Sequence, residues 1–212
     1  GEAELVLAED KHQGVVVRGL REAPATTLQQ AIGIWLHGRQ HRATAATGMN
    51  ENSSRSHCIF MIRAERPVGG DRFGFHSSSS APPKLSLVDL AGSECVKKTC
   101  LAGSSKAENF DILEEAKAIN QSLSTLGLVI NRLAECRRPG PAGSPSQVHV
   151  PYRSSKLTRM LQDCLGGGSH TALMINCSLS TLQVAETLST LRFGMRARAC
   201  VNLVRAGESG EE

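Results

Sequence analysis

The sequence lacks the features expected of a membrane, secreted or cluster-binding protein. None of its apolar runs reaches the roughly 18 residues that a membrane-spanning helix needs, and its acidic first residues are unlike a secretory signal. Its seven cysteines include no Cys-x-x-Cys pair, which favours reduced thiols in a cytoplasmic protein over a metal cluster or a disulfide framework. The net charge of +4 is too small to indicate a nucleic-acid partner. We therefore expect neither a membrane nor a nucleic acid as a partner.

The composition is typical of a globular chain in which strands and helices alternate. Hydrophobic residues make up 40% of the sequence, the usual share for a protein with a packed core. Short β-like runs lie at residues 5–7, 15–17, 58–62, 85–88 and 173–175. Helical segments lie between these runs, and proline- and serine-rich stretches at 67–83 and 137–147 indicate loops. The alternation predicts the α/β class.

Three helical segments have clear sequence signals. Thr26 and Gln29 have the spacing of a capping box, which predicts that a helix begins there. Apolar residues from Ile112 to Leu133 recur at spacings of four and three, which predicts one long helix of about 25 residues. A last helix is expected near residues 184–199.

Two polar clusters are candidates for phosphate and metal chemistry. Asp89 and Gly92 follow the apolar run at residues 85–88, the place where α/β sheets bind ligands. Such an aspartate can help to hold Mg²⁺, although an ordinary turn after a strand has the same composition. The hydroxyls and Arg55 of residues 50–57 can bind a cation and a phosphate, although a polar loop between a helix and a strand explains them equally well.

Taken together, the two clusters resemble the switch motifs of a known family. Asn50-x-x-Ser53-Ser54-Arg55-Ser56-His57 and Asp89-Leu-Ala-Gly92-Ser-Glu94 resemble switch I and switch II of the kinesin motor domain. Further motifs follow in the family's order at residues 119–123, 126–127, 150–158, 165–167 and 186–193. The resemblance implies a partial kinesin-type P-loop NTPase motor domain over residues 1–202, followed by a flexible acidic tail at 203–212. Its fold would be a central mixed β-sheet with helices on both faces, without the first strands and the P-loop.

The resemblance also implies roles for the residues of the two switches, with ATP and Mg²⁺ as cofactors. Ser54 matches a Mg²⁺ ligand, Asp89 reaches Mg²⁺ through water, and Asn50 belongs to the nucleotide-binding segment. Ser53 matches the residue that holds the attacking water, and Gly92 the residue that senses the γ-phosphate. Arg55 and Glu94 match the partners of an ion pair that closes the switches over ATP, which is a plausible two-state latch.

A basic segment is the expected contact with microtubules, whose tubulin surface is acidic. Arg153, Lys156 and Arg159 match microtubule-contacting positions in the family, and Lys98 and Lys117 are weaker candidates. Ser154 or Ser155 can cap a short helix in this segment, which ends at the glycines 166–168. A run of charges alone is equally typical of a solvated helix face.

The sequence departs from the family at three places. The loop Gly-x-x-x-x-Gly-Lys-[Ser/Thr] is absent from the 212 residues, so the main contacts with the β- and γ-phosphates are missing. Nine residues, Ser104 to Ile112, lie where the family commonly has a much shorter loop between switch II and the long helix. Cys95 lies where a basic residue is frequent.

The sequence is compatible with three hypotheses about the function of the chain. The chain is part of an ATP-driven microtubule motor, a kinesin-derived module that binds microtubules without hydrolysing ATP, or a remnant whose exposed sheet edges and apolar faces prevent folding. Each of the first two implies a cytoplasmic protein of the microtubule cytoskeleton, and weak or absent ATP binding by this chain alone.

Overall fold

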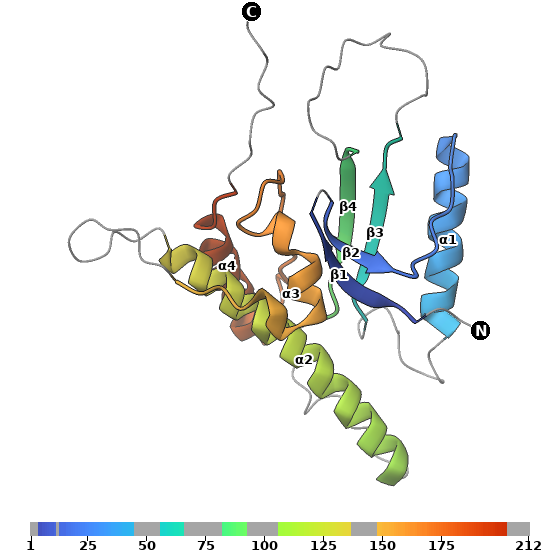
Figure 1. Cartoon of the computed structure of the whole chain (residues 1–212). Helices are drawn as coiled ribbons and strands as arrows, with labels where there is room; N and C mark the ends of the chain where they lie inside the picture. Colours follow the sequence, from blue (N-terminus) through green and yellow to red (C-terminus); the bar gives the residue numbers. More distant parts are fainter. Residues whose placement is uncertain are drawn as a thin grey trace, which may run out of the picture. The chain divides into compact units, whose positions relative to one another are not determined.

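The computed structural model describes residues 4–11, 13–44, 56–65, 82–92, 106–136 and 148–202, of which residues 43–44 and 106–116 are described by their backbone alone. The described residues divide into two compact units. The first contains the described parts of 4–5 and 18–120, and the second contains those of 6–17 and 121–202. Figure 1 shows their helices and strands.

The first unit is built on two antiparallel strands. Strand β3 (Cys58–Arg63) pairs with β4 (Lys84–Asp89) in a register that runs from Cys58 opposite Asp89 to Arg63 opposite Lys84. The strands expected at residues 58–62 and 85–88 are therefore confirmed. The register places the residue that begins β3 opposite the residue that ends β4, so the segments beyond both ends leave the sheet at the same edge.

Helix α1 (Leu28–Thr44) belongs to the same unit and begins with a side-chain cap. The Thr27 hydroxyl accepts a hydrogen bond of 3.2 Å from the Gln30 amide, and the Gln30 side chain accepts one of 2.7 Å from the Thr26 amide. The capping hydroxyl is thus that of Thr27, and the prediction of Thr26 and Gln29 is wrong by one residue. The Gln30 side chain binds the amide of Thr26 and not that of Thr27, so the reciprocal bond of a strict capping box is replaced by one to the preceding residue.

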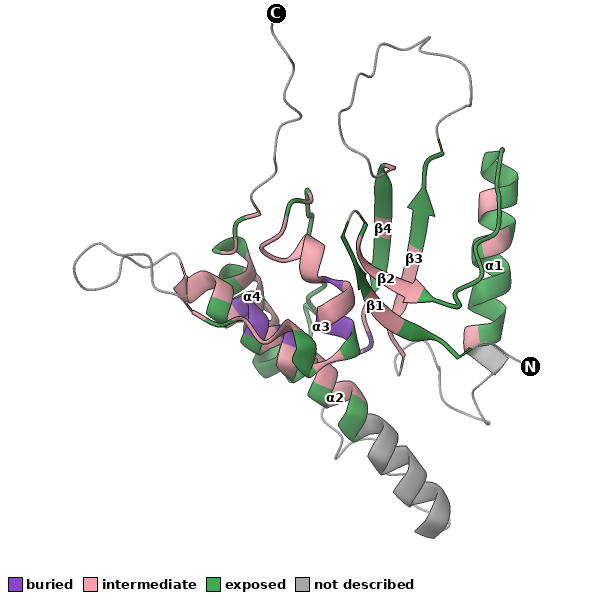
Figure 2. Cartoon of the chain, in the orientation of Figure 1, coloured by how far each residue is buried: buried purple, intermediate pink, exposed green. Residues whose placement is uncertain are grey.

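Large apolar side chains of the first unit remain exposed. They include Leu28, Ile32 and Trp35 on α1, and Leu85 and Leu87 on β4. Figure 2 shows α1 and β4 largely in the colour of exposed residues. Because a sheet or helix of a compact domain normally buries such side chains, these faces are without packing partners among the described residues.

The buried residues of the second unit lie on and beside two helices, while many of its other apolar side chains are exposed. It contains strand β1 (Val6–Asp10), nearly all of β2 (Gly14–Arg18), the later turns of α2 (Lys106–Glu135), α3 (Lys156–Met160) and α4 (Val184–Arg198). Its buried residues are Leu126, Val129 and Ile130 on α2, and Leu157, Thr158 and Leu161 in and after α3. Helix α4 confirms the helix expected near residues 184–199.

Helix α2 begins earlier than the sequence indicates. It starts at Lys106, so most of the insert from Ser104 to Ile112 is helical, and the prediction of a loop there is wrong. The apolar periodicity begins only at Ile112, but residues 106–112 contain neither glycine nor proline and therefore can continue the helix toward its N-terminus.

Among the described residues, no helix is both long and apolar enough to cross a bilayer.

The predicted strand at residues 173–175 does not form. These residues have no regular secondary structure, and the described part of the chain contains two separate two-stranded sheets, β1–β2 and β3–β4. A strand needs a neighbour that accepts and donates its backbone hydrogen bonds. The described residues supply no such neighbour at 173–175. Where a continuous mixed sheet was expected, the described residues form the two short sheets β1–β2 and β3–β4.

Candidate functional site

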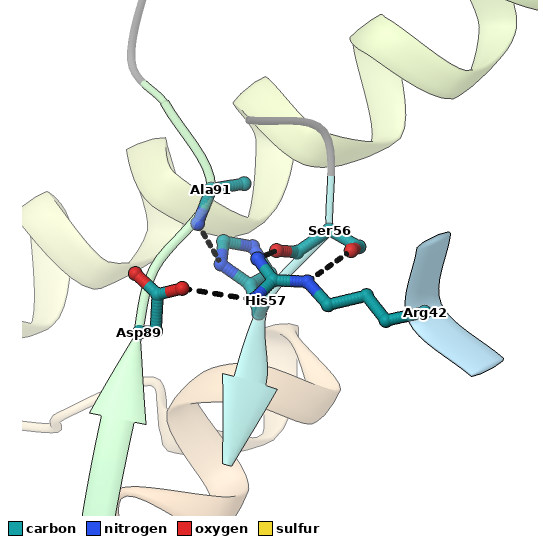
Figure 3. A network of polar contacts seen from close by, with 5 residues as sticks. All are labelled: Arg42, Ser56, His57, Asp89 and Ala91. Atoms are coloured by element: carbon teal, nitrogen blue, oxygen red, sulfur yellow. Dashed lines mark hydrogen bonds and ion pairs between the residues drawn. The ribbon is translucent and has the colours of Figure 1, made fainter. Parts of the chain in front are cut away.

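The β3–β4 register brings the described ends of the two switch-like motifs together. Ser56 and His57 lie directly before β3, and Leu90 to Gly92 lie directly after β4. Because Cys58 pairs with Asp89, both segments leave the sheet at the same edge. Figure 3 shows the polar contacts that form there between His57, Ser56, Asp89, Ala91 and an arginine from α1.

The arginine is Arg42, which lies in the last turn of α1 and joins the two motifs. Its Nη1 donates to Asp89 Oδ2 at 2.8 Å, and its Nε donates to the Ser56 hydroxyl at 2.9 Å. Its Nη2 donates to the Ser56 carbonyl. The Arg42 side chain is 17% exposed and that of Asp89 is 68% exposed, so solvent weakens the ion pair. Arg42 therefore acts mainly by fixing the geometry of both segments.

His57 provides a second connection between the motifs. Its Nδ1 accepts a hydrogen bond of 3.0 Å from the Ala91 amide, and Ala91 is buried. Burial, and then the positive charge of Arg42, lower the pKa of His57 below its ordinary 6.5. The neutral ring is the form that can accept from Ala91, so the pKa shift and the hydrogen bond favour the same state.

The structure describes only part of the predicted nucleotide site. Asp89 ends β4 and Gly92 follows it, as the sequence predicts. Asn50, Ser53, Ser54, Arg55 and Glu94 lie outside the described residues, so the predicted contact between Ser54 and Asp89 and the pair of Arg55 with Glu94 are untested.

The described residues fit a Mg²⁺ site only in part. No group of three histidine, cysteine, aspartate or glutamate side chains among them could hold a metal ion. Asp89 is the single predicted metal-binding residue that is described, and it contacts Arg42 through Oδ2. A carboxylate has two oxygens, so this contact leaves Oδ1 for a water in the shell of a cation. The sequence-based interpretation missed Arg42, because no local pattern connects a basic residue of a helix with a carboxylate 47 residues later.

The candidate filament residues lie on and directly before a capped helix in the second unit. Ser155 caps α3 by accepting from the Thr158 amide at 3.0 Å, which settles the choice between Ser154 and Ser155. Lys156 is exposed and Arg159 half-buried. Arg153 is 80% exposed and donates to Glu9 at 3.2 Å, a partner that the sequence did not indicate. The segment thus presents three cations within seven residues, of which one has a screened ion pair.

The other two candidate cations do not belong to this segment of the sequence. Lys117 lies on α2 within the first unit and is exposed, and Lys98 lies outside the described residues. The structure therefore brings together Arg153, Lys156 and Arg159 and does not test Lys98.

The Leu-Gly-Gly motif that follows α3 has a packing role. Gly166 has a φ of 77°, and a Cβ at this position would lie 2.6 Å from Leu133 Cδ2. A Cβ at Gly167 would lie 2.5 Å from the carbonyl oxygen of Asp163. Both positions therefore require glycine, the first for its backbone conformation and both for space.

Asn202, which the sequence did not single out, closes this glycine turn. Its Oδ1 accepts from the Gly166 amide at 2.7 Å. Its Nδ2 donates to the Cys164 carbonyl at 2.8 Å, to Thr171 Oγ1 at 3.0 Å and to the Ser169 carbonyl. The side chain thus connects the end of α4 to the turn after α3 through contacts distant in sequence.

These features define a chain of the α/β class with two switch-like segments joined at a sheet edge, and comparisons with known proteins identify its family. The kinesin motor domain family matches residues 1–200. The kinesin heavy chain of Neurospora crassa is 48% identical over 198 residues, which are 93% of this chain and 19% of that protein. Kinesin-like protein KIN-1 of Arabidopsis thaliana is 44% identical over 206 residues, 97% of this chain and 40% of that protein.

Solved structures lead to the same family. The structure of a fast kinesin matches 96% of this chain and 51% of its own, with a TM-score of 0.70 and 44% identity. The structure of a KIF14 dimer with AMP-PNP in complex with a microtubule matches 97% of this chain and 52% of its own, with a TM-score of 0.71 and 36% identity. This chain belongs to the kinesin motor domain family, which confirms the resemblance and the α/β class. It spans about a fifth of the Neurospora heavy chain and about half of each solved motor chain.

Proposed function

We propose that this chain is the switch and filament-binding portion of a kinesin microtubule motor, in which ATP hydrolysis is coupled to microtubule binding and movement. The observation that carries the proposal is the network of Arg42 with Asp89 and Ser56, together with the His57–Ala91 hydrogen bond. It joins the end of one switch-like motif to the start of the other, which coupled switches need. Residues 1–202 form the motor portion and 203–212 an acidic tail, and the protein acts on cytoplasmic microtubules.

The nucleotide roles follow the family motifs. ATP with Mg²⁺ supplies the γ-phosphate whose presence or absence the switches report. Ser54 and Asp89 hold Mg²⁺, the latter through water, and Asn50 contributes to the nucleotide site. Ser53 positions the attacking water, and Gly92 donates its backbone amide toward the phosphate. Arg55 and Glu94 close the switches as an ion pair.

A chain with these 212 residues alone binds ATP·Mg²⁺ weakly. The phosphate-binding loop with its lysine is absent from the sequence, so the anchoring of the β- and γ-phosphates requires residues outside it. Hydrolysis therefore belongs to the longer motor domain that the solved relatives contain, of which this chain matches about half.

A second candidate function is microtubule binding without ATP turnover. The division of the chain into two units favours it, because Asp89 and Gly92 lie in the first unit whereas Arg153, Lys156 and Arg159 lie in the second. The three cations can meet acidic tubulin whether or not the first unit binds a nucleotide. Such contacts between exposed charges weaken as salt rises, because the Debye length is about 8 Å at physiological ionic strength.

Microtubule co-sedimentation at two salt concentrations tests the proposal. The triple variant Arg153→Ala, Lys156→Ala, Arg159→Ala should pellet less than the parent, and binding of the parent should fall steeply with salt. The matched control is Arg192→Ala, Arg196→Ala, Arg198→Ala, which removes three exposed cations from α4 and should pellet like the parent. Asp89→Ala should also pellet normally.

The outcomes separate the two candidate functions. If the triple variant pellets as well as the parent, the assigned filament surface is wrong. If a longer chain with a phosphate-binding loop hydrolyses ATP faster on microtubules and Asp89→Ala abolishes this, the chain is part of a motor. If hydrolysis is absent in the longer chain while binding persists, the chain is a binding module.

A further inference from the structure

Two histidines on α1 lie in direct contact, one helical turn apart. His37 and His41 have ring centroids 4.4 Å apart at an interplanar angle of 82°, and their Nε2 atoms are 3.1 Å apart. Positions four apart lie on the same helix face, so the pairing follows from the spacing. Both side chains are exposed, and the switch contacts described above do not involve them.

The separation of the two nitrogens suits joint coordination of one metal ion. Imidazole nitrogens bind zinc at about 2.0–2.1 Å, so two nitrogens 3.1 Å apart subtend an angle of about 100° at a shared ion. This value lies between the octahedral and tetrahedral angles. In the metal-free protein one Nε2–H donates to the other Nε2, and on metal binding that ring moves its proton to Nδ1.

The surroundings leave room for the remaining ligands of an ion. A Cβ at Gly33, one turn before His37, or at Gly38, three residues before His41, would meet no atom within 4 Å. Positions three and four apart share a helix face, so this open space adjoins the two imidazoles. Water can therefore complete the coordination shell.

The charges around the pair determine which ions it prefers. Helix α1 contains no aspartate or glutamate, so it offers no carboxylate oxygens for Ca²⁺ or Mg²⁺. Its nearby cations are engaged elsewhere, since the Arg39 guanidinium lies 5.6 Å from the centre of the Trp35 ring and Arg42 contacts Asp89. Neutral imidazoles favour zinc, copper and nickel ions.

We propose that His37 and His41 form a two-imidazole chelating site for a divalent transition-metal ion of the zinc and copper class. The site is open, with water in its other positions, and lies in the turn that precedes Arg42. It is separate from the Mg²⁺ of the nucleotide site, because it has nitrogen ligands and is built from one helix.

Histidine modification with diethylpyrocarbonate, mapped by mass spectrometry on the full 212-residue chain, tests this site with Zn²⁺ as the probe. At a Zn²⁺ concentration about ten times the dissociation constant, modification of His37 and His41 should slow about tenfold. Exposed His149 and His170 in the second unit should react at unchanged rates. Because protection is measured at each histidine, Zn²⁺ bound by cysteines elsewhere does not affect the result.

Single substitutions establish whether the two rings act together. In His41→Gln, protection of His37 should require about 100-fold more Zn²⁺, because the second ligand no longer binds intramolecularly. The matched control His170→Gln removes an exposed imidazole and should leave protection of the pair unchanged. Equal protection of all exposed histidines, protection by Mg²⁺ at the same concentration, or unchanged protection of His37 in His41→Gln would each overturn the proposal.

Discussion

Replacing Asn202 with alanine should destabilise the second unit. The asparagine amide offers one acceptor and two donor hydrogens to the glycine turn, so about three hydrogen bonds are lost. At about 1 kcal/mol each, reduced because Asn202 is half-buried and water replaces part of the contacts, the expected loss is about 2–3 kcal/mol. For a chain of this size the midpoint of thermal unfolding should fall by about 4–12 °C.

The assay is thermal unfolding followed by the near-ultraviolet signal of Tyr152, the only tyrosine of the chain. Its hydroxyl donates to the Leu165 carbonyl in the same turn, so its signal reports the packing that Asn202 maintains. Asn202→Asp keeps the acceptor for Gly166 but directs a negative charge at the Cys164 and Ser169 carbonyls. It should therefore lower the midpoint of thermal unfolding at least as much as Asn202→Ala does. Gln183→Ala, an exposed substitution in the same unit, is the control. If Asn202→Ala unfolds at the temperature of the control, the turn does not depend on this side chain.

Three further predictions concern the first unit and the nucleotide. Because the pKa of His57 is lowered below 6.5, this histidine binds a proton at higher pH in the unfolded chain than in the folded one. Its contribution to stability is therefore fully present above pH 6.5 and is lost as the pH falls toward the folded pKa. His57→Asn, whose amide oxygen can accept from Ala91, should flatten this part of a urea-denaturation profile, and an unchanged slope argues against the assignment. Arg42→Ala should lower the free energy of unfolding, followed by Trp35 fluorescence, by about 1–2 kcal/mol. A double-mutant cycle with Asp89→Asn should give a coupling energy of about 0.5–1 kcal/mol, and additive losses would show that the pair is not coupled. Isothermal titration of the 212-residue chain with ATP·Mg²⁺ should detect no micromolar binding, because the phosphate-binding loop is absent, and one tight site would contradict this.

Local patterns predicted the elements whose signals are local. The apolar runs at residues 58–62 and 85–88 identified β3 and β4, and the periodicity after Ile112 identified most of α2. The start of α2 was missed because its first turns carry helix-forming residues without an apolar stripe. The run at 173–175 is as apolar as a strand, but a strand also requires neighbours, which local composition does not report.

The contacts of the site depend on distant residues and were harder to predict. The motif resemblance singled out Asp89, whereas its partner Arg42 is 47 residues earlier and has no local signal that points to a carboxylate. Asn202 lies 36 residues from Gly166, and Glu9 lies 144 residues from Arg153. Such pairings follow from the tertiary fold, which the sequence pattern constrains only through strand register and helix faces.

Zero-length carbodiimide cross-linking of the chain on microtubules, mapped by mass spectrometry, tests the proposed filament surface most directly. The reagent joins a lysine amine to a carboxylate in contact with it, and Lys156 is the exposed lysine of the Arg153–Arg159 segment. We predict a link from Lys156 to an acidic residue of tubulin that disappears at high salt, and no tubulin link from exposed Lys84 on β4. Links from Lys84 with none from Lys156 would contradict the proposal that this segment binds the filament.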